Sequence, residues 1–79
     1  MKVTIEKIYE ILNEIIPGID FKIETKLVDS DILDSFDIAT LAAELEDIFD
    51  IEITVNDLVP ENFNSGLSIY ELVLNRQNE

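Results

Sequence analysis

The residue whose surroundings most suggest chemistry is Ser35, within residues 32–38. It follows two apolar residues and an aspartate, and it opens the strongest helical pattern in the sequence. Backbone N–H groups at the start of a helix lack intrahelical acceptors and favour a phosphate group. The chain has no histidine and no cysteine, so no imidazole is present to activate the serine as a nucleophile. The pattern therefore favours a hydroxyl that another enzyme modifies over a catalytic one.

Helix capping is a simpler role for the same region. Either Asp34 or Ser35 can cap the N-terminus of the helix, and the sequence leaves both open. Asp37 would lie favourably in the first turn. Phe36 lies outside the apolar stripe, so we expect its ring to be exposed near Ser35, which indicates a docking point for a partner. A contact between Phe36 and the preceding loop is the alternative.

The chain is strongly acidic, with 18 acidic and 5 basic residues and a net charge of −13 over 79 residues. No basic residue occurs from Leu27 to Asn75. This charge argues against nucleic acid or anionic membranes as partners and favours basic protein surfaces; solubility alone is the alternative reason for it. No apolar run approaches the roughly 20 residues of a membrane span, and no signal-peptide pattern is present. We therefore expect a cytoplasmic monomer without membrane insertion.

The apolar spacing predicts two long amphipathic helices near the start of the chain. The first covers Val3–Ile16 and ends at Pro17-Gly18, and the second runs from about Ser35 to Phe49. We expect residues 17–34 to form an irregular crossing loop, because a lone two-stranded ribbon there would be marginal. The apolar side chains expected to hold this loop to the bundle are Ile19, Phe21, Ile23, Leu27 and Ile32.

Two further helices are expected in the last third of the chain. Asn56 is a plausible cap for a brief third helix through about Val59, which is irregular around Pro60 and Phe63. The last helix runs to about Asn75, capped either by Ser65 or by Ser68; its expected core face is Ile69, Leu72 and Val73. The prediction is an all-α four-helix bundle forming a single domain over residues 1–79.

The acids around the second helix form the expected partner surface. A solvated helix face is the alternative for each acid taken singly. Without interspersed bases, however, the helix accepts repulsion of about 0.2–0.5 kcal/mol per like-charged pair, which suggests selection for more than stability. Small residues in this helix favour close packing over space for a guest. The acids are Asp31, Asp34, Asp37, Glu44, Glu46, Asp47 and Asp50, and the small residues are Ala39, Ala42 and Ala43.

No metal site is expected among these acids. Counted from Asp29, a twelve-residue calcium loop would need glycine at the sixth position and glutamate at the twelfth. Asp34 and Thr40 stand there instead. Zinc sites and histidine-based catalytic triads lack their ligands and bases.

The Asp34-Ser35-Phe36 motif, with the helix over residues 37–50 behind it, resembles acyl carrier proteins over nearly the whole length of the chain. The resemblance implies a four-helix bundle whose Ser35 carries 4′-phosphopantetheine through a phosphodiester. The thiol of this arm would hold an acyl or aminoacyl group as a thioester, and the protein itself would not be an enzyme. By position, the family's recognition surface corresponds to Asp34, Phe36, Asp37, Ala39 and Ala43.

The resemblance also implies a set of partner enzymes. A phosphopantetheinyl transferase would install the arm from coenzyme A. An acyl- or aminoacyl-activating ligase and downstream acyltransferases or synthases, each with a basic docking surface, would then bind the acidic second helix, where Glu44, Glu46 and Asp47 extend the recognition surface.

The residues flanking the serine bear on the cargo. Many carriers of fatty acid biosynthesis have a small residue before the aspartate and leucine after the serine, whereas this chain has Leu33 and Phe36. This pattern is closer to D-alanyl carrier proteins and to stand-alone carriers of peptide or polyketide pathways. The alternative function is an unmodified acidic interaction module that keeps the carrier fold.

Overall fold

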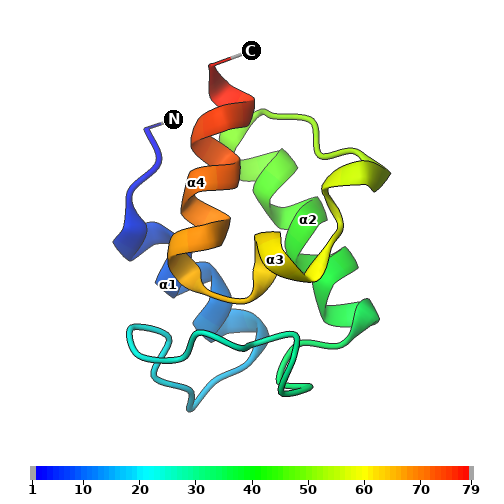
Figure 1. Cartoon of the computed structure of the whole chain (residues 1–79). Helices are drawn as coiled ribbons and strands as arrows, with labels where there is room; N and C mark the ends of the chain where they lie inside the picture. Colours follow the sequence, from blue (N-terminus) through cyan, green and yellow to red (C-terminus); the bar gives the residue numbers. More distant parts are fainter. Residues whose placement is uncertain (1, 79) are drawn as a thin grey trace.

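The computed structural model describes residues 2–78, which form four α-helices and one short 3₁₀ turn, with no strand in that range (Figure 1). Helix α4 contacts each of the other three helices, and α1 also contacts α2. The predicted all-α four-helix bundle is therefore confirmed. The elements are α1 (Ile5–Ile15), α2 (Ser35–Phe49), η1 (Val55–Asp57), α3 (Pro60–Phe63) and α4 (Gly66–Gln77).

Helix α1 begins two residues later than the apolar spacing predicts. Thr4 is extended and caps the helix, and its Oγ1 accepts a hydrogen bond from the backbone N–H of Lys7 at 3.2 Å. Val3 precedes this cap, yet its side chain is buried in the core. The apolar spacing includes Val3 in the helix because it indicates which residues are buried. It does not indicate at which residue the helix begins.

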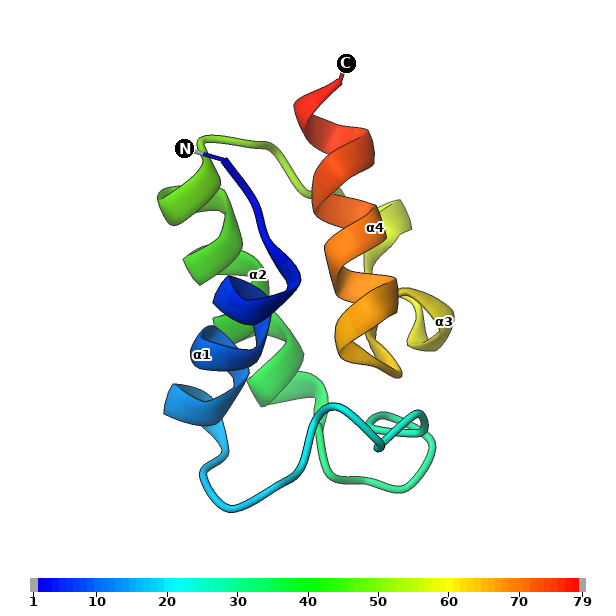
Figure 2. The ribbon, with the colours of Figure 1, turned by 90° about the vertical axis from the view of Figure 1, so that its left-hand side faces the viewer.

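The long loop between α1 and α2 lies across one end of the bundle in both ribbon views (Figures 1 and 2). Phe21 and Leu27 are buried in the core, as predicted. The prediction for Ile23 is wrong, because its side chain is 77% exposed. The backbone turns here, and the carbonyl of Asp20 accepts hydrogen bonds from the N–H groups of Ile23 and Glu24. Residues 19 and 32, both isoleucine, are half-buried against the core.

A short third helix is present, as predicted, but its predicted bounds are wrong, because α3 begins at Pro60 and the 3₁₀ turn η1 occupies the stretch before it. Thr54 is the extended residue before η1, and its N–H and hydroxyl both donate to Oδ2 of Asp57. Pro60 occupies the first turn of α3, where its missing N–H costs no helical hydrogen bond. The proline therefore starts a helix rather than disturbing one.

The open choice of cap for α4 is settled in favour of Ser65. Its Oγ accepts a hydrogen bond from the N–H of Ser68 at 3.0 Å, and the two hydroxyl oxygens lie 2.9 Å apart. The predicted core face is confirmed, since Ile69, Leu72 and Val73 are buried. Helix α4 extends to Gln77, two residues beyond the predicted end.

None of the helices in the described range is long and apolar enough to cross a lipid bilayer.

Candidate functional site

A reciprocal pair of aspartates starts α2. Oδ1 of Asp34 accepts a hydrogen bond from the N–H of Asp37 at 2.8 Å, and Oδ2 of Asp37 accepts one from the N–H of Asp34 at 3.3 Å. This arrangement is a capping box with Asp34 as the N-cap. Ser35 is therefore the first helical residue and not the cap, which settles the choice that the sequence left open. Because Asp34 does the capping, the hydroxyl of Ser35 is not needed for it.

The hydroxyl of Ser35 is accessible to a modifying enzyme. Its side chain is exposed, and its oxygen has no hydrogen-bond partner among the described residues. Within the same range, the backbone N–H groups of Ser35 and Phe36 have no acceptor either. A free hydroxyl beside uncommitted amides at the positive end of a fifteen-residue helix suits a phosphodiester. The residues present therefore fit a phosphate-linked prosthetic group.

Two apolar residues near the serine differ sharply in their exposure. Leu33 is only 1% exposed, and its N–H donates to the carbonyl of Leu27 at 2.8 Å. Phe36 is 69% exposed, which confirms the expectation from its place outside the apolar stripe. The buried leucine fixes the chain just before the cap, while the phenylalanine presents an apolar surface beside the hydroxyl. An exposed aromatic ring of this kind is suited to contact with another protein.

The exposed side of α2 carries most of the residues expected to bind partners. Phe36, Ala39, Ala43 and Asp47 are three or four residues apart and all exposed, so they form one stripe along the helix, with exposed Glu44 beside it. We call Phe36, Ala39, Ala43, Glu44 and Asp47 the α2 surface. The close-packing interpretation of the small residues is wrong for the two alanines on this surface, because they face solvent. It holds for Ala42, which is buried.

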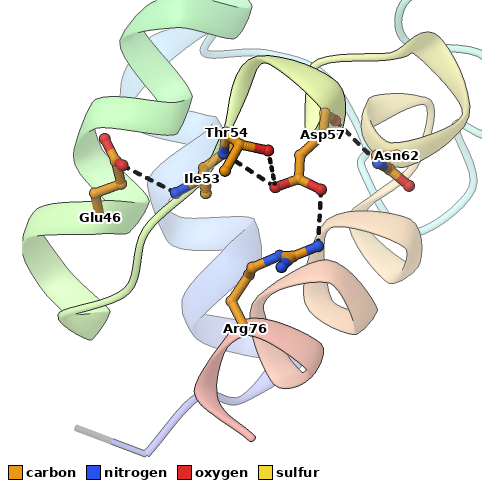
Figure 3. Close-up of polar contacts among 6 residues, drawn as sticks. All are labelled: Glu46, Ile53, Thr54, Asp57, Asn62 and Arg76. Atoms are coloured by element: carbon orange, nitrogen blue, oxygen red, sulfur yellow. Dashed lines mark hydrogen bonds and ion pairs between the residues drawn. The ribbon is translucent and has the colours of Figure 1, made fainter. Parts of the chain in front are cut away.

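Glu46, like Asp34 and Asp37 of the capping box, is an acid of the expected partner surface that also serves the fold. Oε2 of Glu46 accepts a hydrogen bond from the N–H of Ile53 at 2.9 Å, which ties the segment after α2 back to the helix (Figure 3). Glu46 is half-buried, as is Asp37 of the capping box. A substitution of either residue would therefore change the local structure as well as the surface charge.

The charge at the end of α2 opposes the helix dipole. The last turn contains no basic residue, and it carries Glu46 and Asp47, with Asp50 at the left-handed C-cap. Negative charge near a helix C-terminus is unfavourable. The negative charge at this end of α2 is therefore kept at some expense to helix stability.

A second polar cluster, remote from Ser35 in sequence, centres on the buried carboxylate of Asp57 (Figure 3). Oδ1 of Asp57 lies 2.8 Å from Nη2 of Arg76, and its backbone carbonyl accepts a hydrogen bond from Nδ2 of Asn62. Hydrogen bonds from Thr54 and the charge of Arg76 outweigh the effect of burial and lower the pKa of Asp57. A carboxylate that is held ionised by these partners serves to join η1, α3 and α4.

Sequence reasoning did not identify the Asp57 cluster. Arg76 is 19 residues from Asp57, and no periodic pattern connects the two. The available signal was compositional, because Arg76 is the only base after Lys26.

The comparison with protein families agrees with this geometry. A family model described as a phosphopantetheine attachment site matches residues 5–70, which is more than half of the chain. The chain therefore belongs to this family of phosphopantetheine-binding carrier proteins. Its members bind 4′-phosphopantetheine covalently, are generally non-catalytic and interact with transferases and synthases. No curated protein and no solved structure gives a significant match.

Proposed function

We propose that Ser35 is the residue to which 4′-phosphopantetheine is attached, and that residues 1–79 act as one carrier domain. The observation that carries this proposal is the exposed hydroxyl at the first position of α2, without a hydrogen-bond partner among the described residues. The capping box of Asp34 and Asp37 holds this position at the helix start. Family membership supplies the prosthetic group, and the hydroxyl supplies a suitable point of attachment.

The attached arm would supply a thiol that holds an acyl or aminoacyl cargo as a thioester. The chain itself contributes an exposed tether on a small body, and its α2 surface presents the charge and the aromatic ring for docking. Electrostatic steering makes such docking fast without requiring high affinity. We infer that the phosphopantetheinyl transferase, the activating ligase and the downstream acyltransferases or synthases bind this surface through basic residues, and that the protein works in the cytoplasm as a monomer.

The proposal is tested by intact mass spectrometry. The protein is incubated with coenzyme A and a phosphopantetheinyl transferase of broad specificity. We expect one phosphopantetheine to be added to the wild-type protein and none to Ser35→Ala. Ser30→Ala is the matched control, because Ser30 is an exposed serine in the loop before the cap and should be dispensable.

Absence of modification in the wild type, or modification that persists in Ser35→Ala, would overturn the proposal. An unmodified wild type that still binds a basic protein through the α2 surface would instead support the acidic interaction module. The cargo is tested separately by offering D-alanine, other amino acids and fatty acids to the modified protein, each with its activating ligase and ATP. The substrate that is retained as a thioester identifies the cargo class.

A further inference from the structure

An asparagine at the corner between α3 and α4 holds the loop that leads to Ser35. Oδ1 of Asn64 accepts hydrogen bonds from the backbone N–H groups of Val28 at 3.0 Å and Asp29 at 3.1 Å. Nδ2 of Asn64 donates to Oδ2 of Asp29 at 3.2 Å. The backbone carbonyl of Asn64 accepts a further hydrogen bond from the N–H of Leu27 at 2.8 Å. One residue thus fixes three consecutive residues of the loop.

The loop passes this constraint on towards the helix start. The carbonyl of Leu27 accepts a hydrogen bond from the N–H of Leu33, with 2.8 Å between oxygen and nitrogen, and both leucine side chains are buried. Leu33 directly precedes Asp34, the cap of α2, and Ser35 follows the cap. A continuous path of hydrogen bonds and covalent bonds therefore connects Asn64 with the residue that we propose is modified.

The corner that carries Asn64 is itself fixed. Phe63 before it is fully buried, and Ser65 after it caps α4. The asparagine therefore has a fixed backbone from which to hold a loop that has no regular secondary structure of its own.

We propose that Asn64 is a positioning residue for modification of Ser35, an inference that rests on the proposed function. Its side chain orders Val28 and Asp29, which directly follow Leu27, the acceptor of the Leu33 N–H, and so keeps the start of α2 in the form that a transferase binds. If the loop opened, only the closed fraction of molecules would bind, and the apparent affinity would fall in proportion. The chemical step would be unchanged once the closed form is bound, so the loss should appear in KM and not in kcat.

The test compares three variants in the transferase reaction with coenzyme A, at a temperature well below the melting temperature of each. Asn64→Ala removes the three side-chain hydrogen bonds to Val28 and Asp29 and keeps the backbone hydrogen bond to Leu27, so it tests the side chain alone. Asn62→Ala is the matched control, because Asn62 lies on α3, two residues before Asn64, but bonds to the carbonyl of Asp57 and not to the loop. The exchange variant combines Asp29→Asn with Asn64→Asp and keeps both the net charge and the donor–acceptor pairing. Amide hydrogen exchange at Leu33 is measured alongside, with Leu45 in the middle of α2 as the internal reference.

For Asn64→Ala we expect KM for the carrier to rise about tenfold with kcat unchanged to within about twofold, and exchange at Leu33 but not Leu45 to accelerate by at least about tenfold. In the exchange variant, both KM and the rate of amide exchange at Leu33 should return most of the way to their wild-type values. Asn62→Ala should keep the wild-type KM. A wild-type KM in Asn64→Ala, or an equal rise in Asn62→Ala, would overturn the inference while leaving the proposed function intact. A wild-type protein that is never modified would overturn both.

Discussion

Asp34 and Asp37 hold each other's backbone, each carboxylate accepting the N–H group of the other residue, at 2.8 and 3.3 Å. The two residues between them, Ser35 and Phe36, are both exposed. The carboxylates are thus engaged in starting the helix, while the hydroxyl and the aromatic ring between them are presented to solvent. This division of roles underlies the proposal that Ser35 is modified and Phe36 is recognised.

Removal of the cap should destabilise the protein. Asp34→Ala leaves the N–H of Asp37 without its acceptor, and loss of an N-cap costs about 0.5–2 kcal/mol. Asp34→Asn should cost less, because the amide oxygen can still accept. Urea denaturation gives the free energy of unfolding for each variant. Glu44→Ala, on the exposed side of the same helix, is the control and should change stability by less than about 0.5 kcal/mol; a loss as large as that of Asp34→Ala would contradict the capping role.

Much of the bundle could be predicted from the sequence because burial follows helical periodicity. The second helix has the predicted bounds, Ser35–Phe49, and the core face of the last helix is as expected. Periodicity also placed Phe36 outside the stripe, and the structure exposes it. Ile23 shows the limit of this reasoning, since a backbone turn at Asp20 and not a periodic pattern decides which way its side chain points.

The remaining features depend on contacts between residues that are distant in sequence, or on a choice between equivalent residues. Asp34 and Ser35 are both good caps, so only geometry could separate them. Asn64 forms a hydrogen bond with Asp29, which is 35 residues away in the sequence, and Arg76 pairs with Asp57, which is 19 residues away. No local sequence pattern encodes such pairs, because they depend on how the helices pack against one another.

Leu33 and Phe36, on either side of Asp34-Ser35, should respond differently to truncation. Leu33→Ala removes a fully buried side chain, and such substitutions cost about 2–5 kcal/mol. Phe36→Ala removes an exposed ring and should change the free energy of unfolding by less than about 0.5 kcal/mol, yet raise KM in the transferase reaction. Denaturation and steady-state kinetics separate the two effects. A Phe36→Ala variant that is destabilised but kinetically normal would assign the ring to the fold.

Charge reversal on the α2 surface should separate stability from docking. Asp47→Lys replaces an unfavourable charge near the C-terminus of α2 with a favourable one, so the protein should gain about 0.3–1 kcal/mol. The same change should slow association with a basic transferase, and the difference from wild type should shrink as salt is added. Urea denaturation and stopped-flow association at several ionic strengths provide the measurements. Unchanged association would remove Asp47 from the docking surface.

The Asp57 cluster should contribute to stability in a pH-dependent way. The pKa of Asp57 is lowered in the folded protein from its ordinary value of 3.8, so its ionised form is favoured by folding. This contribution is present above about pH 3.8 and is lost as pH falls from there through the lowered pKa. Asp57→Asn should therefore be less stable than wild type at pH 7, by about 1–3 kcal/mol, and the gap should narrow below pH 3.8. If the difference in free energy of unfolding between wild type and Asp57→Asn stayed constant from pH 7 to pH 3, the ionised carboxylate of Asp57 would not be the source of this stability.

The most direct test of the central claim locates the prosthetic group on the chain. After modification with coenzyme A and a transferase, a protease that cleaves on the amino side of aspartate should release Asp34-Ser35-Phe36 as a separate fragment, because Asp37 follows it. We expect tandem mass spectrometry to find phosphopantetheine on this fragment alone, at the serine. An unmodified 34–36 fragment, with the group on a fragment that contains Ser30, Ser65 or Ser68, would contradict it.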